Sequence, residues 1–285
     1  MIKEKVKEII DVLRVYKYIW TYSTFSSPLK LDSNTPQKGK AIVLCNGPSL
    51  KNNLPELPTG EDYMVVNYFG LDENFLRLKP KYYCLADGMF FLPYEGNKYK
   101  ERIDALRDLF NNPHVVNWDL TIFVPSNQKK RFDYRFNLTN PKIKVTPVNT
   151  IDVQTDKIRH NYYIKQWACP SPQTVANLAI FVLINLGYQQ IDLYGVDHTF
   201  IEGLCVDDNN VVCHMFRHYY NDEMKLVPAE DCFGNRPTLS SELSTLVTIF
   251  RSHEKLEAYS KAVGCTIVNM TKGSMIDSYK RGYLK

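Results

Sequence analysis

From residue 41 onward the chain alternates short runs rich in β-branched and aromatic residues with helical stretches. This alternation is typical of βαβ units, in which helices join parallel strands and cover the sheet. It predicts an α/β fold on a mostly parallel sheet, in one domain over residues 41–285. The predicted strands are Ala41–Cys45, Tyr63–Val66, Tyr82–Leu85, Val115–Trp118, Thr121–Val124, Ile191–Tyr194 and Thr266–Val268.

Two helices are predicted in the second half of the chain. Residues 173–186 are almost wholly apolar, which indicates a helix buried against the sheet, and residues 240–263 form a second helix. Gly187 and Gly264 follow them, and glycine commonly ends a helix. Between the helices, residues 198–239 have no clean period and exceed an ordinary connection in length, so we expect a lid or binding loop there.

Residues 1–40 form a separate basic segment that carries the whole net charge of +4. A period of three and four predicts an amphipathic helix over residues 2–20, and residues 23–40 have the composition of a linker. A basic helix with an aromatic end is typical of peripheral membrane anchors. Docking on the body, or on a second subunit of a homo-oligomer, explains the same period. The apolar positions are Ile2, Val6, Ile9, Ile10, Leu13, Tyr16 and Trp20.

Composition excludes several classes of protein. Basic and acidic residues cancel after residue 40, so no nucleic-acid surface is expected. No apolar run is long enough to span a bilayer and no secretory leader is recognisable, so we expect a cytoplasmic protein, either free or peripheral on the inner face of the cell membrane. The seven scattered cysteines include no Cys-x-x-Cys pair, which argues against disulfides and a structural zinc site.

Polar residues follow four predicted strands, where open α/β sheets bind ligands. They are Asn46-Gly47-Pro48-Ser49, Asn67, Asp87, and Gly195 with Asp197. Gly47 would let a ligand approach the backbone, Pro48 presets the turn, and Asn46 and Ser49 supply an amide and a hydroxyl for ribose or phosphate. An ordinary βα turn explains the same residues. The standard dinucleotide and P-loop glycine patterns are absent from the sequence.

The bacterial sialyltransferases of glycosyltransferase family 42 are similar, in order and spacing, to three segments of this chain. The segments are Ile-Val-Leu-Cys-Asn46-Gly47-Pro48-Ser49-Leu-Lys, Val-Val-Asn67-Tyr, and Ile-Asn-Leu-Gly187-Tyr-Gln-Gln-Ile-Asp-Leu-Tyr-Gly195-Val-Asp197. The chain also resembles the broader group of flagellin-modifying Maf proteins and hydroxymethylpterin pyrophosphokinases, as does its ending Val268-Asn269-Met-Thr271-Lys-Gly273-Ser274. The resemblance covers residues 40–275.

The resemblance implies a Rossmann-like fold of the glycosyltransferase A type and an enzyme that uses CMP-sialic acid with inversion, without a metal or other cofactor. The implied nucleotide contacts are Asn46, Gly47, Ser49, Asn67 and the loop Ser171–Thr174, including Gln173 and Thr174. The family's lid base belongs to a His-x-x-x-His pair, which corresponds here to His214 and His218. His218 is therefore the candidate base. Candidates to stabilise the leaving phosphate are Arg217, Tyr219 and Tyr220.

Thr199 and the basic helix before residue 40 depart from the family pattern, and the acidic pair Asp207-Asp208 has two interpretations. The family has a tyrosine two residues after the aspartate of Gly-x-Asp, whereas this chain has Thr199, so phosphate stabilisation comes from elsewhere or the donor differs. Asp207-Asp208 has the composition of a solvated turn rather than of a metal-binding pair.

We expect an inverting glycosyltransferase that moves a sialic-acid-like or other acidic sugar from a CMP-activated donor to a hydroxyl of a glycan or lipid-linked acceptor. Two alternatives stay open. One is a pyrophosphokinase of the hydroxymethylpterin type that uses ATP, and the other is a non-catalytic nucleotide- or sugar-binding subunit.

Overall fold

The computed structural model describes residues 2–22, 24, 38–93, 97–217, 224–231 and 234–283. Within them, eight strands form one sheet in the order β11-β10-β6-β1-β2-β3-β4-β5, and every pair is parallel. The predicted parallel α/β architecture is confirmed. The strands are β1 (Lys38–Leu44), β2 (Asp62–Val66), β3 (Tyr82–Cys84), β4 (Leu120–Pro125), β5 (Ile143–Val148), β6 (Tyr188–Tyr194), β10 (Thr266–Asn269) and β11 (Lys280–Arg281).

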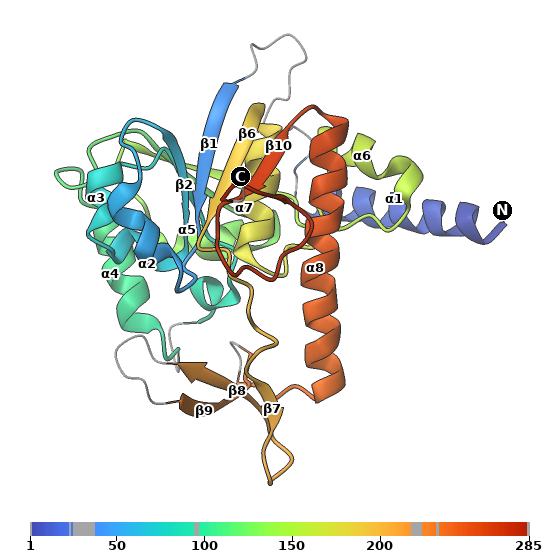
Figure 1. Cartoon of the computed structure of the whole chain (residues 1–285). Coiled ribbons are helices and arrows are strands. Elements are labelled where there is room, and N and C mark those ends of the chain that lie inside the picture. Colours follow the sequence, from blue (N-terminus) through green and yellow to red (C-terminus); the bar gives the residue numbers. More distant parts are fainter. Residues whose placement is uncertain are drawn as a thin grey trace.

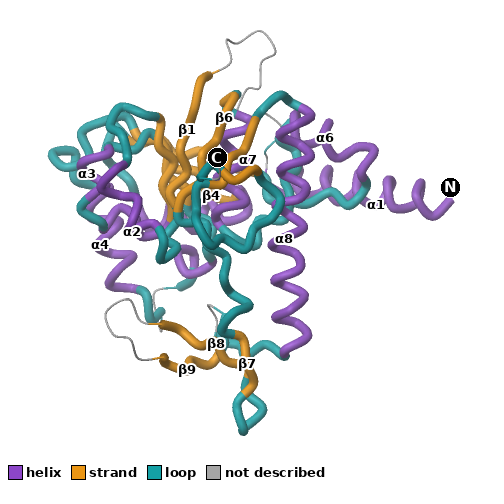
Figure 2. The backbone as a smooth tube through the Cα atoms, viewed as in Figure 1, coloured by secondary structure: helices purple, strands orange, loops and turns teal. Residues whose placement is uncertain are grey.

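Helices cover both faces of this sheet, as Figures 1 and 2 show. Two apolar clusters form the core, because alternate residues of each strand point to opposite faces. Helices α1, α6, α7 and α8 contribute to one cluster, and α2 to α5 lie on the other face. The helices are α1 (Ile2–Tyr22), α2 (Leu50–Asn53), α3 (Asn74–Leu78), α4 (Lys100–Phe110), α5 (Lys129–Phe136), α6 (Asp156–Ile164), α7 (Val175–Asn185) and α8 (Leu239–Ala262).

Six of the predicted strands are confirmed, and the seventh, Val115–Trp118, is wrong. The carbonyl of Asn112 accepts hydrogen bonds from the N–H groups of both Val115 and Val116, so the segment turns instead of extending. Burial of Val116 in the core explains its apolar sequence. Strand β5, which the sequence did not predict, contains Pro147 and lies at the edge of the sheet, where a missing N–H is tolerated.

The two predicted long helices are confirmed as α7 and α8. In α7 every residue from Ala176 to Asn185 is buried, in agreement with its apolar sequence. Gly187 and Gly264 adopt φ angles of 85° and 78°, the left-handed conformation that ends a helix.

Helix α1 is also confirmed, and one of its faces docks on the body. Val15 and Ile19 are fully buried in the core cluster beside α7. The carboxylate of Asp11 accepts hydrogen bonds from the N–H groups of Gln154 and Thr155, at 3.0 and 2.8 Å, at the start of α6. The helix therefore belongs to the fold of the domain.

Residues 198–239 contain a small antiparallel sheet in the order β7-β8-β9. It lies beyond the ends of the main strands, beside the start of α8, as Figure 1 shows. The Asp207 carboxylate accepts hydrogen bonds from the N–H groups of Asn209 and Val211, which confirms the predicted turn. The strands are β7 (Leu204–Val206), β8 (Val212–Arg217) and β9 (Met224–Pro228).

Candidate functional site

The polar residues that follow β6, β1, β2 and β3 lie at one edge of the sheet. These four strands are consecutive neighbours and parallel, so their carboxyl ends meet there. The strand order also reverses at this place, because the chain runs from β1 through β5 in one direction and then places β6 on the other side of β1. Such a switch point is where open α/β sheets bind ligands.

The turn after β1 is held by the turn after β6. Ser49 donates hydrogen bonds to the Asp197 carboxylate from its hydroxyl, at 2.8 Å, and from its N–H, at 3.2 Å. The N–H of Gly47 donates to the carbonyl of Gly195 at 2.9 Å. Asp197 is only 9% exposed, so the protein encloses most of its side chain. The structure thus brings Gly47, Ser49, Gly195 and Asp197 together as predicted, with Asp197 supporting the turn.

The need for glycine at position 47 has a different reason from the one the sequence suggested. A Cβ atom there would lie 1.9 Å from a carboxylate oxygen of Asp197 and 2.4 Å from the carbonyl oxygen of Gly195. The space beside Gly47 is therefore filled by the β6 turn rather than left for a ligand. Gly195 has a φ of 67°, and a Cβ on it would lie 2.2 Å from the Cys45 carbonyl oxygen, so both glycines permit close contact of the two turns.

Asn67, directly after β2, has a left-handed backbone and a side-chain acceptor without a partner in the protein. Its φ is 50°, in the left-handed region that asparagine adopts more readily than most residues other than glycine. The hydroxyl of Tyr83 donates to the Asn67 carbonyl and accepts from the N–H of Gly70 at 2.9 Å, which fixes the backbone. The buried side-chain Oδ1 of Asn67 has no hydrogen-bond partner. Buried polar atoms without a partner in the protein are rare, so this oxygen is an acceptor that water or a ligand can use.

The remaining predicted nucleotide residues at this edge have solvent contact. Asn46 and Pro48 are exposed in the first turn, and Asn46 reaches the Val66 carbonyl at 3.4 Å. Asp87 is exposed, and its carboxylate accepts from the N–H of Met89, which starts the 3-10 helix η3 (Gly88–Phe91). These residues are available to a ligand bound across the strand ends.

The loop Ser171–Thr174 leads into α7, whose C-terminus joins β6 through a short turn. Strand β6 starts at the amino ends of the parallel strands. Helix α7, which precedes it and runs back along the sheet, therefore begins near the carboxyl ends of the strands, where the candidate site lies. The Ser171 carbonyl accepts from Ser252 of α8 at 2.7 Å, and Gln173 donates to the Ser171 hydroxyl at 3.2 Å. The N–H of Thr174 donates to Asn177, so part of this loop's bonding capacity caps α7.

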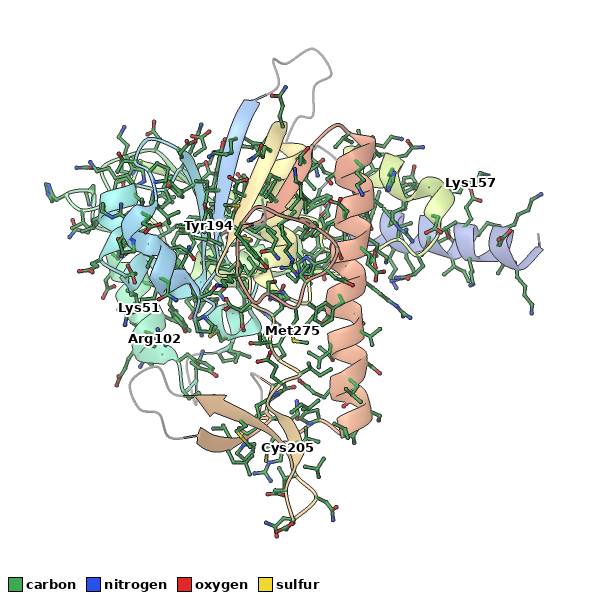
Figure 3. The ribbon with its side chains drawn as sticks, viewed as in Figure 1. Lys51, Arg102, Lys157, Tyr194, Cys205 and Met275 are labelled. Carbon is green, nitrogen blue, oxygen red and sulfur yellow. The ribbon has the colours of Figure 1, made fainter. Side chains whose placement is uncertain are left out.

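The segment after β10 supports the β6 turn and was not assigned a role from sequence, although its motif was recognised. The Thr271 hydroxyl accepts from the N–H of Val196 at 3.1 Å, and the Ser274 hydroxyl donates to the Val196 carbonyl at 2.6 Å. The N–H of Met275 donates to the Asp197 carbonyl at 2.9 Å. Figure 3 labels Met275 on the side of the main sheet that faces the small sheet. The motif therefore fixes the backbone that presents Asp197.

Sequence reasoning also missed a buried row of three side chains next to Asp197. His198, with φ 52°, lies 3.2 Å from His253 between their Nε2 atoms, and Nδ1 of His253 lies 2.8 Å from the Tyr279 hydroxyl. Burial lowers the pKa of His198 to about 4, and burial followed by the neighbouring His198 lowers the pKa of His253. Both rings are therefore neutral near pH 7, and one donates to the other.

A cation lies over the ring of Tyr68, the residue that follows Asn67 in sequence. The guanidinium carbon of Arg102, at the start of α4, is 4.2 Å from the ring centre of Tyr68, a favourable cation–π distance. Figure 3 labels Arg102 and Lys51 on the side of the molecule that faces the small sheet. Lys51 ends the first segment of the resemblance but was given no role from sequence, and Arg102 belongs to no motif.

Only some of the predicted lid residues belong to the described part of the chain. His218, Tyr219 and Tyr220 lie outside the described residues, and Arg217 is the last residue of β8. His214 Nε2 lies 3.3 Å from Glu242 Oε1 at the start of α8, so His214 links the small sheet to that helix. Thr199 is partly exposed directly after His198.

The described residues include no group of three or more His, Cys, Asp or Glu side chains that could hold a metal ion. The described cysteines are all free. Burial, followed by the nearby Asp197 carboxylate, raises the pKa of Cys45 to about 12. Cys45 is thus a thiol at neutral pH and a poor nucleophile.

No protein-family model and no curated protein matches the chain. Among solved structures, the chain is similar to the sialyltransferase CstII from Campylobacter jejuni, determined with the substrate analogue cytidine-5'-monophosphate. The identity is 16%, the TM-score is 0.44, and the match covers 87% of this chain and 86% of that chain. An α-2,3-sialyltransferase from Campylobacter jejuni in apo form has 16% identity and a TM-score of 0.42, with 90% of this chain and 83% of that chain covered.

Proposed function

We propose that this protein is an inverting glycosyltransferase that takes a sialic-acid-like or other acidic sugar from a CMP-activated donor. The acceptor is a hydroxyl of a glycan or of a lipid-linked glycan. The nucleotide binds across the ends of β6, β1, β2 and β3, and the small sheet formed by β7, β8 and β9 acts as the lid.

The observation that carries the proposal is the unpartnered Oδ1 of Asn67, at the end of β2 and one strand away from the switch point between β1 and β6. A nucleotide offers hydroxyl and amino donors that would satisfy this acceptor, and Tyr83 fixes the left-handed backbone of Asn67. Asn67 is also one of the residues through which the sequence resembles the sialyltransferases of family 42. An ordinary βα turn accounts for the left-handed asparagine but not for its unpartnered oxygen.

The start of α7 supports an anionic ligand at the same edge. Backbone N–H groups at a helix N-terminus are partly unpaired and carry partial positive charge, which favours phosphate. Ser171 and Gln173 lie in the loop before this helix and are partly or fully accessible. We therefore assign the donor phosphate to the α7 side of the site and the nucleoside to the Asn67 side.

In the proposed reaction the acceptor hydroxyl attacks the anomeric carbon while the bond to the CMP oxygen breaks. His218 takes the hydroxyl proton, because histidine is the side chain most often used as a general base at neutral pH. Arg217, Tyr219 and Tyr220 donate hydrogen bonds to the departing phosphate. None of these steps needs a protein-bound metal.

Binding of nucleotides tests the donor. Calorimetric titration with CMP, UDP, GDP and ATP, each with and without Mg²⁺, is expected to give binding of CMP that does not depend on Mg²⁺. Preference for ATP with Mg²⁺, and release of AMP with a pterin alcohol as acceptor, would assign the chain to the pyrophosphokinases instead. Tight CMP binding with no transfer from any CMP-activated acidic sugar would indicate a binding subunit.

The role of His218 is tested by His218→Ala with His114→Ala as a matched control, since His114 is an exposed histidine outside the site. Loss of a general base typically lowers the rate by about 10²–10⁴-fold. We expect this loss in kcat for His218→Ala, with CMP affinity unchanged, and an unchanged rate for His114→Ala. Equal transfer rates in both variants would exclude His218 as the base.

A further inference from the structure

Helix α1 carries two apolar faces, and the body covers one of them. The covered face consists of the buried Val15 and Ile19, with Asp11 and Tyr18 beside them. Asp11 bonds to the start of α6, and the Tyr18 hydroxyl lies 3.0 Å from both Ser126 Oγ and Thr150 Oγ1. These polar contacts fix the rotation of the helix about its own axis.

The second face is the apolar period that the sequence predicts, and the structure leaves it exposed. Its two most exposed members are Trp20, at 77%, and Leu13, at 64%. At 3.6 residues per turn these side chains form one continuous stripe about 21 Å long on the side opposite Val15. Soluble monomers seldom expose a continuous apolar surface without a function for it. The members of the stripe are Val6, Ile9, Ile10, Leu13, Tyr16 and Trp20.

Charges are sorted around the same helix. The exposed Lys5 borders the stripe on one side, and basic residues border the other side. All acidic residues of α1 fall on the docked side, where Glu8 lies 3.6 Å from Lys157. The body continues the combination of aromatic and basic side chains. The Tyr16 ring contacts the Trp167 ring, and Lys165 Nζ lies 4.8 Å from the centre of the Trp167 ring. The basic residues of the second border are Lys3, Lys7, Arg14 and Lys17.

We propose that α1 binds the surface of an anionic phospholipid membrane through the stripe from Val6 to Trp20. An apolar stripe with a terminal tryptophan would enter the boundary between headgroups and acyl chains, and the flanking lysines would meet lipid phosphates. Within the described residues no helix combines the length and apolarity needed to cross a bilayer. The helix therefore lies along the membrane surface.

Charge decides against a second copy of the chain as the occupant. In a symmetric pair of α1 helices joined through the stripe, each basic border would face a basic border of the partner, whichever way the helices run. Lys5 and Lys17 would then be brought close to like charges, whereas an anionic lipid surface neutralises them. This inference goes beyond the proposed glycosyltransferase activity and does not depend on it.

Flotation of the full chain with lipid vesicles tests the proposal. We expect binding to phosphatidylcholine vesicles that contain about 30% phosphatidylglycerol, weaker binding to pure phosphatidylcholine, and release as salt is raised to about 0.5 M. Point variants are preferable to removal of the helix, because removal would uncover the core surface beneath Val15 and Ile19.

The double variant Leu13→Ser, Trp20→Ser is expected to lose about tenfold or more in affinity for anionic vesicles. The double variant Lys5→Gln, Lys17→Gln should lose affinity for anionic vesicles only. Tyr134→Ser is the matched control, since Tyr134 is 87% exposed on α5, and it should bind like the parent. All variants should keep the parent melting temperature.

Two results would overturn the proposal. One is failure of the parent to bind anionic vesicles, and the other is equal binding by the parent and the Leu13, Trp20 variant. A dimer that the same variant converts to monomer, without vesicle binding, would assign the stripe to a second copy. Nucleotide titration of the same samples separates this test from that of the proposed function, because CMP binding should be equal in all variants.

Discussion

The hydroxyl of Ser49 donates a 2.8 Å hydrogen bond to the carboxylate of Asp197, across 148 positions of sequence. This bond joins the turns on the two sides of the sheet's switch point. Asp197 also accepts from the Ser49 N–H at 3.2 Å, so one carboxylate orders the first helical turn after β1. The geometry of the candidate nucleotide site thus depends on a contact between two residues that were each expected to contact the ligand.

Ser49→Ala and Asp197→Asn should therefore weaken the fold as a coupled pair. Each single change removes or weakens a partly buried charge-assisted hydrogen bond and should lower the free energy of unfolding by about 1–3 kcal/mol. The double variant should lose less than the sum of the two, by about 1 kcal/mol, because the shared bond is lost only once. Urea unfolding of the four proteins measures this coupling. Strict additivity would mean that the two side chains act independently.

Gly47→Ala, in the turn after β1, should destabilise the protein, while Gly39→Ala, within β1, should not. The new Cβ at position 47 would overlap Asp197 and the Gly195 carbonyl, whereas no atom lies within 4 Å of a Cβ at position 39. Forced overlap of this kind typically costs about 1–3 kcal/mol. Thermal unfolding of both variants checks the prediction. A wild-type melting temperature for Gly47→Ala would show that the two turns separate without cost.

The strand ends of the candidate site were predictable because they are local signals. A short apolar run followed by Asn46-Gly47 or Gly195-Val196-Asp197 marks the end of a strand, and parallel pairing then brings such ends to one edge. What the sequence did not show is which of these residues contact one another. The sequence suggests that Asp197 contacts the ligand. The structure shows that its carboxylate accepts a hydrogen bond from Ser49, a residue distant in sequence.

Contacts between distant segments account for most of what was missed. His198, His253 and Tyr279 come from the β6 turn, α8 and the C-terminal segment, and no local pattern links them. Val115–Trp118 was predicted as a strand because composition reports burial, while its turn depends on the Asn112 carbonyl. The period of α1 was read correctly, but docking is made by Val15 and Ile19, outside that period.

Asn67→Gly should increase stability and decrease nucleotide affinity. Glycine adopts the φ of 50° without strain, and the change removes a buried acceptor that has no partner in the protein. After the entropy cost of the new glycine, we expect a net gain of about 1 kcal/mol in unfolding free energy. Loss of the ligand's hydrogen bond should weaken CMP binding by about tenfold or more.

Asn137→Gly is the control for that experiment. Asn137 has a φ of 38° at the exposed end of α5, so glycine there adopts the same left-handed conformation with no steric cost and away from the candidate site. Its melting temperature should rise and its CMP affinity should stay that of the parent. If Asn67→Gly binds CMP as tightly as Asn137→Gly does, Asn67 Oδ1 has no role in nucleotide binding.

The buried pair His198 and His253 should make the protein sensitive to acid. Burial lowers the pKa of His198 from 6.5 to about 4 and also lowers the pKa of His253, so below pH 6.5 the unfolded chain binds protons that the folded chain does not. The contribution of these neutral histidines to the free energy of unfolding is fully present above pH 6.5 and is lost as pH falls toward 4. His198 alone would contribute roughly 3 kcal/mol over this range, from 1.36 kcal/mol per pKa unit.

His198→Asn isolates this effect, because asparagine tolerates the left-handed φ of 52° but does not titrate. Urea unfolding between pH 7 and about 4.5 should show a shallower loss of stability in this variant than in the parent. The exposed His114→Asn should follow the parent curve throughout. Parallel curves for the parent and His198→Asn would mean that the buried imidazole is protonated as readily in the folded chain as in the unfolded one.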